Sequence, residues 1–182
     1  MVIDSLREFI KILEEKGMLL RIKKPVDIRY EIGDICRKAL DLRGPALLFE
    51  NIKGYAGWKL ASGILGTRER IALALNTSVN EMLNEASKRL DEEPLEPTLV
   101  SKSEAPCKEV IVKDPDLTKL PIPIWHPRDG GPYITFSLQT TKNERGVRDV
   151  GIIRQMVVGP REARILLNPG KNIYANYINK EA

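Results

Sequence analysis

A proline-rich acidic stretch, residues 91–106, divides the sequence into two halves with different hydrophobic patterns. Before it, helical apolar spacings alternate with short uninterrupted apolar runs, which predicts alternating helices and buried strands. After it, strand-like segments follow one another across tight turns. The stretch itself has no period and holds three prolines, so we interpret it as a linker. We therefore expect two domains, residues 1–100 and 107–182.

The first half predicts an α/β layer architecture. We expect helices over residues 4–16, 30–42, 67–75 and 78–90, and strands over 18–22, 46–49 and 60–64. Asp4 or Ser5 is the expected cap of the first helix, and Thr67 that of the third. Ser78, with Glu81 three residues later, predicts a capping box at the start of the fourth helix.

The second half predicts consecutive antiparallel strands, as in a β-barrel. They are expected over residues 110–112, 133–141, 150–158 and 163–167, before a helical start at 173–178. These strands are too few to close a barrel. Either partners complete it or the chain is a fragment, and the unpaired edges predict a homo-oligomer.

Composition narrows the class of partner. The net charge of +4 is mild and suits a binder of phosphates or carboxylates. Nucleic acid is not expected, because no basic run alternates with aromatic residues. Cys36 and Cys107 lie far apart, which predicts a reducing compartment without disulfides. The N-terminus does not resemble a signal peptide, and no apolar run is long enough for a membrane span. We expect a cytoplasmic protein with no membrane partner.

Residues 116–135, DLTKLPIPIWHPRDGGPYIT, are the first segment that can carry function. Their prolines force an extended path, and Asp129-Gly130-Gly131-Pro132 makes a tight turn before a strand. The segment is either a structured interdomain loop or a rigid wall beside a pocket. His126 is expected to be structural, and Trp58 and Trp125 to serve packing.

Residues 148–156, RDVGIIRQM, are the second. Strand alternation places Val150, Ile152 and Arg154 on one face and the intervening residues on the other. Arg154 is either a strand-edge arginine paired with a carboxylate or a fork for phosphate or carboxylate. Asp149 is either a turn cap or a ligand for a hard cation.

Residues 168–174, NPGKNIY, are the third. Pro169-Gly170 turns the chain, and Lys171 and Asn172 project toward a helix start. This arrangement is typical of a phosphate cradle, although it lacks the Walker A and Rossmann glycine spacings.

Together these segments resemble the UbiD decarboxylase family along the whole chain. The resemblance rests on GPALLFENIKG from residue 44, LPIPIWHPRDGGPYIT at 120–135 and the D-x-G-x-x-R stretch at 149–154. LLRIKKPVD and GPREARILLNPGKNIY look most like the archaeal branch, some members of which decarboxylate trans-anhydromevalonate 5-phosphate in isoprenoid synthesis.

The resemblance implies an α+β fold: an N-terminal α/β domain, then the first antiparallel strands of a split β-barrel that holds a flavin. It implies prenylated FMN and Mn²⁺ or Mg²⁺ as cofactors, and a flavin prenyltransferase as the supplier of the prenylated FMN. A second metal-ligand glutamate and the proton donor are implied beyond residue 182.

The resemblance also implies the site residues. Asp149 stands where the family has a metal-ligating asparagine, and Arg154 matches the arginine that contacts cofactor and substrate carboxylate. Further cofactor contacts are implied at Ile152, Ile153, Leu166, Leu167, Asn168, Lys171 and Asn172.

The function implied is removal of CO2 from a small unsaturated acid by a carboxy-lyase. Two alternatives remain open at this point: a truncated non-catalytic domain used in assembly, and a flavin-binding split-barrel protein.

Overall fold

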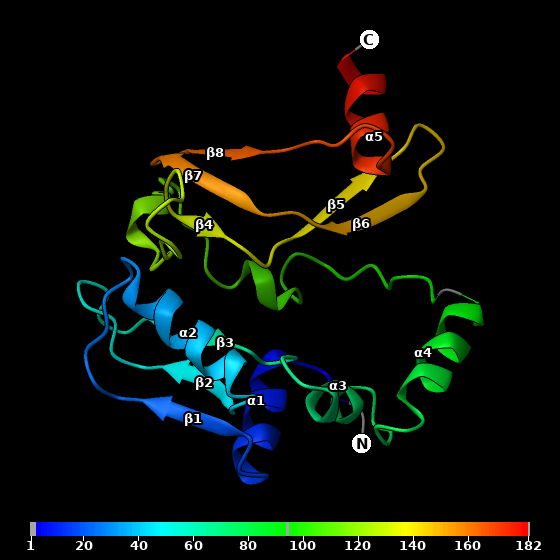
Figure 1. Cartoon of the computed structure of the whole chain (residues 1–182). Helices are drawn as coiled ribbons and strands as arrows, with labels where there is room; N and C mark the ends of the chain where they lie inside the picture. The colour runs from blue at the N-terminus through cyan, green and yellow to red at the C-terminus, as the bar shows by residue number, and fades with distance from the viewer. Residues whose placement is uncertain (1–2, 94, 182) are drawn as a thin grey trace. The chain divides into compact units, whose positions relative to one another are not determined.

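The computed structural model describes residues 3–93 and 95–181, which form two compact units (Figure 1). Unit 1 contains residues 3–24, 35–51 and the described part of 59–115. Unit 2 contains residues 25–34, 52–58 and 116–181. Two short segments from the first third of the chain therefore belong to the same unit as its last third.

Unit 1 is built on a three-stranded sheet in the order β1-β2-β3. β1 (Leu19–Ile22) runs parallel to β2 (Ala46–Phe49), and β3 (Leu60–Ser62) is antiparallel to β2. Every residue of the central strand β2 is buried. The helices are α1 (Leu6–Glu15), α3 (Arg68–Ala74), α4 (Met82–Asp91) and the larger part of α2 (Glu31–Asp41).

The core of unit 1 follows from the apolar face of α1. Phe9 and Leu13 lie one turn apart on that helix and pack with Ala46 of β2. Partly buried apolar residues from β1 and α3 join this cluster, which fixes α1 and α3 against the sheet.

The helix caps agree with two of the three expectations. Ser5 Oγ accepts a hydrogen bond from Glu8 N at 3.2 Å, and Thr67 Oγ1 accepts one from Arg70 N at 3.4 Å. Of the expected capping box, only the bond from Glu81 N to Ser78 Oγ, at 3.3 Å, is found among the described residues, and it closes a turn before α4, which begins at Met82.

Unit 2 contains two antiparallel sheets. β4 (Tyr133–Ile134), β7 (Gln155–Gly159) and β8 (Glu162–Ile165) form one, in the order β4-β7-β8. β5 (Leu138–Lys142) and β6 (Arg148–Ile152) form a two-stranded ribbon, against which α5 (Asn172–Glu181) packs (Figure 1). The fold is α+β, as expected, and none of the sheets formed by the described residues closes into a barrel.

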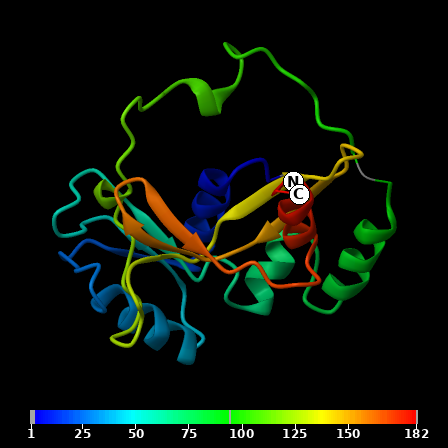
Figure 2. The same cartoon turned by 90° about the horizontal axis from the view of Figure 1, so that it is seen from above.

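The segment between α4 and unit 2 contains no strand among its described residues (Figure 2). It carries only the 3-10 turn η1 (Pro106–Lys108) and is counted with unit 1; Pro94 of the expected linker lies outside the described residues. The expected strand at 110–112 is wrong. Val110, Ile111 and Val112 are all exposed and pair with no strand. A single apolar run forms a stable strand only when another strand or a helix packs against it.

The segment 116–135 ties together the parts of unit 2. It begins with the 3-10 turn η2 (Leu117–Lys119). Tyr30 N donates to Ile124 O at 2.9 Å, and Ile124 N donates to Ile28 O at 3.0 Å. Trp125 Nε1 donates at 2.9 Å to the carbonyl oxygen of Tyr133, which is the first residue of β4. A Cβ on Gly33 would overlap the Trp125 carbonyl, so this contact requires glycine.

His126 agrees with its structural interpretation, since its Nδ1 accepts from Arg128 N at 3.1 Å within a loop.

Across the described part of the chain, no helix is long and apolar enough to cross a membrane.

Candidate functional site

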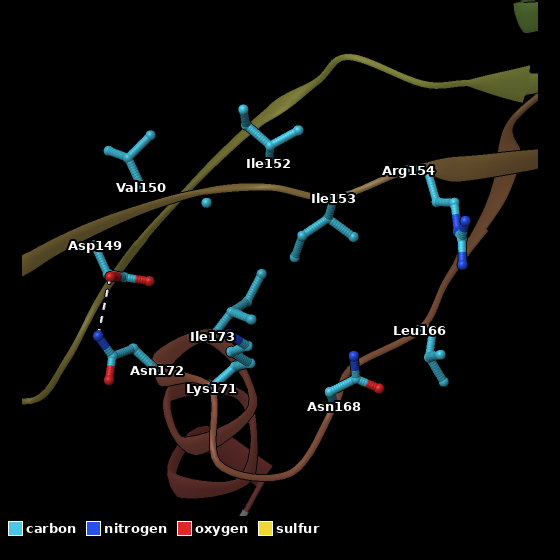
Figure 3. A pocket seen from close by; sticks show the side chains of 11 residues that line it. Asp149, Val150, Ile152, Ile153, Arg154, Leu166, Asn168, Lys171, Asn172 and Ile173 are labelled. Atoms are coloured by element: carbon cyan, nitrogen blue, oxygen red, sulfur yellow. Dashed lines mark hydrogen bonds between the residues drawn. The ribbon is translucent and has the colours of Figure 1, made fainter. Parts of the chain in front are cut away.

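A pocket of about 400 Å³ lies in unit 2, between the end of β6 and the start of α5 (Figure 3). It brings together parts of two segments singled out from the sequence, 148–156 and 168–174, with Leu166 in addition. The strand segment 150–152 lines it, together with the apolar residues Ile153, Leu166 and Ile173 and the polar residues Asp149, Arg154, Asn168, Lys171 and Asn172.

The pocket brings together all but one of the residues singled out from the sequence. Leu167 is the exception: it is half-buried and is not part of the lining. Val150, Gly151 and Ile173 line the pocket but were not expected there. Their position beside expected residues was the available signal.

Asp149 is fixed by the helix that follows the pocket. Asn172, the first residue of α5, donates through Nδ2 to Asp149 Oδ1 at 3.0 Å (Figure 3). One turn later the buried Asn176 donates to Thr141 Oγ1 at 2.8 Å. These two bonds dock α5 on the half-buried face of the ribbon, and leave Asp149 with a second carboxylate oxygen for a ligand.

The cations of the pocket are Arg154 and Lys171, both exposed. No carboxylate among the described residues forms an ion pair with Arg154, so the interpretation as a paired strand-edge arginine is not supported. Lys171 stands at the N-terminal end of α5, where Tyr174 N donates back to Lys171 O at 3.0 Å, while the N–H groups of Asn172 and Ile173 have no acceptor among the described residues. Two cations and free N–H groups can together bind phosphate or carboxylate oxygens.

The Arg154 side chain does not point to the side of the strand that alternation predicts for it. Figure 3 shows its side chain on the same side of the strand as Ile153, toward Leu166 and Asn168, with Val150 and Ile152 on the opposite side. The two expected long strands are each interrupted at this point, between β4 and β5 and between β6 and β7. The interruption turns Arg154 into the pocket.

The metal-binding capacity of this region is small. Within residues 3–93 and 95–181, no group of three or more His, Cys, Asp or Glu side chains is placed to hold a metal ion. Asp149 is the carboxylate of the pocket lining, accompanied by amide oxygens of Asn168 and Asn172. Such a donor set suits a hard divalent cation that keeps water and phosphate oxygens among its ligands.

Two family models match this chain. The N-terminal domain of 3-octaprenyl-4-hydroxybenzoate carboxy-lyase, UbiD_N, matches residues 10–90, and the Rift-related domain of the same enzyme, UbiD, matches residues 98–182. The chain therefore belongs to the UbiD family, through its N-terminal and Rift-related domains.

Solved structures of UbiD-class enzymes resemble the chain closely. An evolved dimeric form of HmfF from Pelotomaculum thermopropionicum, in complex with prFMN, is 38% identical; the match covers 97% of this chain with a TM-score of 0.89. Vanillic acid decarboxylase from Sedimentibacter hydroxybenzoicus in its closed form is 30% identical over 100% of the chain, with a TM-score of 0.92.

A third match is apo 3,4-dihydroxybenzoic acid decarboxylase from Klebsiella pneumoniae, 29% identical over 98% of this chain with a TM-score of 0.88. In these three matches the chain spans 41%, 40% and 40% of the length of the other protein.

Proposed function

We propose that this chain is the cofactor-binding part of a non-oxidative decarboxylase, which removes CO2 from a small unsaturated acid with prenylated FMN and a divalent metal. The observation that carries the proposal is one pocket lined by Arg154, Lys171 and Asp149, with no carboxylate paired to Arg154 among the described residues. The family and the prFMN complex of HmfF support it.

The residues of the pocket fit a flavin phosphate and a hard cation. Lys171 and the first turn of α5 suit phosphate oxygens, and Asp149 suits Mn²⁺ or Mg²⁺. A Cβ built on Gly151 meets no atom within 4 Å, so this part of the lining has room for a flat ring. Ile153, Leu166 and Ile173 offer apolar surface to the ring.

In the proposed mechanism, Arg154 forms two parallel hydrogen bonds to the substrate carboxylate and holds it until CO2 departs. Lys171 neutralises phosphate charge, and Asp149 holds the metal beside it. The apolar lining excludes water from the reacting carboxylate. The prenylated flavin, when bound, supplies the electron sink for decarboxylation.

The proposal extends to substrate and setting. We propose an archaeal-type enzyme of isoprenoid biosynthesis, with trans-anhydromevalonate 5-phosphate as the first acid to assay, since Arg154 suits the carboxylate of such a substrate. A flavin prenyltransferase would supply the cofactor, Mn²⁺ is the preferred metal, and a homo-oligomer is expected.

Flavin binding tests the site. The chain is titrated with FMN and, separately, with riboflavin, which lacks the phosphate, and quenching of flavin fluorescence is followed. Arg154→Ala and Lys171→Ala should each weaken FMN binding roughly 10- to 100-fold, the effect of one charge-assisted hydrogen bond. Lys171→Ala should leave riboflavin binding nearly unchanged.

Matched controls are Arg148→Ala and Lys180→Ala, exposed cations of β6 and α5 outside the pocket lining. Both should bind FMN like the wild type. Equal losses in the control and pocket variants would show a general charge effect and contradict the proposed site.

Turnover tests the reaction. With prenylated FMN, Mn²⁺ and candidate acids, CO2 release is measured for the enzyme that contains this chain. Arg154→Ala should lower kcat by about a hundredfold or more, as for other lost charge-stabilising groups. Near-normal decarboxylation by that variant would overturn the role of Arg154.

A further inference from the structure

The β4–β5 and β6–β7 segments form one long hairpin with an unequal interruption. Ile134 pairs with Gln155, and Leu138 pairs with Ile152. Between these pairs, three residues on one side, 135–137, oppose two residues on the other, 153–154. This count is that of a β-bulge, which bends the bulged strand and locally increases twist.

The bulge lies where the alternation of side chains fails. In a continuous strand, Arg154 would share a face with Ile152. Figure 3 shows it instead on the side of Ile153, directed toward Leu166 and Asn168. Bulges are known to redirect side chains beside functional sites. The direction of Arg154 thus depends on the conformation of the two residues 153–154.

The Ser137 side chain bonds to the first of these two residues and to their neighbours. Ser137 Oγ donates to Ile153 O at 2.6 Å, and it accepts from Gln155 Nε2 at 3.1 Å and Gln139 Nε2 at 3.3 Å. A hydroxyl has one donor and two acceptor sites, so all three are used. The backbone adds a longer bond, from Ile153 N to Ser137 O at 3.3 Å.

We propose that Ser137 is a positioning residue: its hydroxyl ties the bulged segment 135–137 to the Ile153 carbonyl and thereby directs Arg154 into the pocket. The inference rests on the proposed function, in which Arg154 contacts cofactor and substrate. Ser137 itself is not among the residues that line the pocket. It acts through the main chain that carries Arg154.

Hydrogen exchange of the ligand-free chain tests the clamp. In Ser137→Ala the Ile153 carbonyl and the side-chain amide groups of Gln139 and Gln155 lose the hydroxyl to which all three bond. The Ile153 amide should then exchange roughly three- to tenfold faster, the effect of one net hydrogen bond on local opening. Ser137→Thr keeps the hydroxyl and should restore wild-type exchange.

The matched control is Thr140→Ala, which removes an exposed hydroxyl three residues away on β5. It should leave the Ile153 exchange rate unchanged. If Ser137→Ala exchanges like the wild type at Ile153, or if Ser137→Thr does not restore the rate, the clamp is overturned. None of these readings depends on flavin binding.

A double-mutant cycle with FMN tests whether the clamp acts through Arg154. Ser137→Ala should weaken FMN binding roughly three- to tenfold in the wild-type background. It should change binding less than about twofold when Arg154 is already alanine. An equal effect in both backgrounds would overturn the positioning role. If the wild-type chain binds no FMN, the proposed function fails, while the exchange result still decides the clamp.

Discussion

At the scale of single residues, a hydrogen bond between Asn172 and Asp149 fixes the carboxylate of the pocket. The family resemblance implies an asparagine where this chain has Asp149, and Asn172 donates to that carboxylate at 3.0 Å. A carboxylate attracts a divalent cation more strongly than an amide does, but it repels a neighbouring phosphate when no cation is present. In the proposed site we therefore expect cofactor binding to depend on the metal.

Asp149→Asn tests this dependence with one isosteric change. Without metal, FMN should bind a few-fold more tightly than to the wild type, because a repulsive charge is removed. With Mn²⁺ present, the enhancement of FMN binding should be smaller in the variant, because the cation is held less strongly. Both values come from fluorescence titrations with and without Mn²⁺. The same enhancement in variant and wild type would show that Asp149 does not hold the metal.

At the scale of secondary-structure elements, an ion cluster connects α1 and the sheet of unit 1. Arg21 on β1 contacts Glu14 of α1 at 2.5 Å and Glu50 at 2.6 Å, directly after β2. Lys59 also contacts Glu50, at 3.0 Å. The hydrogen bond from Arg21 lowers the pKa of Glu14, and those from Lys59 and then Arg21 lower the pKa of Glu50. The cluster therefore links three elements while both carboxylates are ionised.

Acid should weaken this cluster. Because the folded-state pKa of both carboxyls lies below the ordinary value of 4.5, their contribution is present above that pH and is lost as the pH falls through the folded values. Arg21→Met should thus lower Tm at pH 7, and the difference from the wild type should shrink below about pH 4. Thermal unfolding by circular dichroism measures both.

Lys11→Met is the control, since its pair with Glu15 is exposed on both sides and 3.8 Å long. It should leave Tm almost unchanged at either pH. A difference between Arg21→Met and wild type that persists unchanged at low pH would assign the effect to lost packing of the arginine stem.

At the scale of the whole molecule, the two units interleave along the sequence. Residues 25–34 and 52–58 belong to unit 2 together with 116–181. Main-chain bonds join Ile124 to Ile28 and Tyr30, and Ile32, Ile52 and Ile122 are buried in that unit. Domains of residues 1–100 and 107–182 stay a proposal, and this interleaving bears on how separable they are.

We predict that the separate piece 107–182 does not fold by itself. It lacks the partners of Ile124 and two buried isoleucines of unit 2, so its apolar segments have too little to pack against. Mixed with the piece 1–106, it should regain a cooperative thermal transition and co-elute on gel filtration. The uncut chain is the reference. A cooperative transition of 107–182 alone would contradict the prediction.

Local patterns accounted for much of the secondary structure and for the composition of the pocket. The apolar spacing of α1, the buried run of β2 and the caps at Ser5 and Thr67 depend on neighbouring residues, and so they are visible in the sequence. The D-x-G-x-x-R and NPGKNIY segments likewise contain most of the residues that line the pocket.

The exposed coil at 110–112 and the bulge at 135–137, opposite residues 153–154, were set by the tertiary structure. Both depend on a distant partner: the apolar run has no strand to pair with, and the direction of Arg154 depends on the three-residue segment 135–137. Alternation fixes the face of a side chain only while strand pairing continues, and pairing is a long-range property. The residues of the site are therefore a local feature of this chain, whereas the direction in which Arg154 points is not.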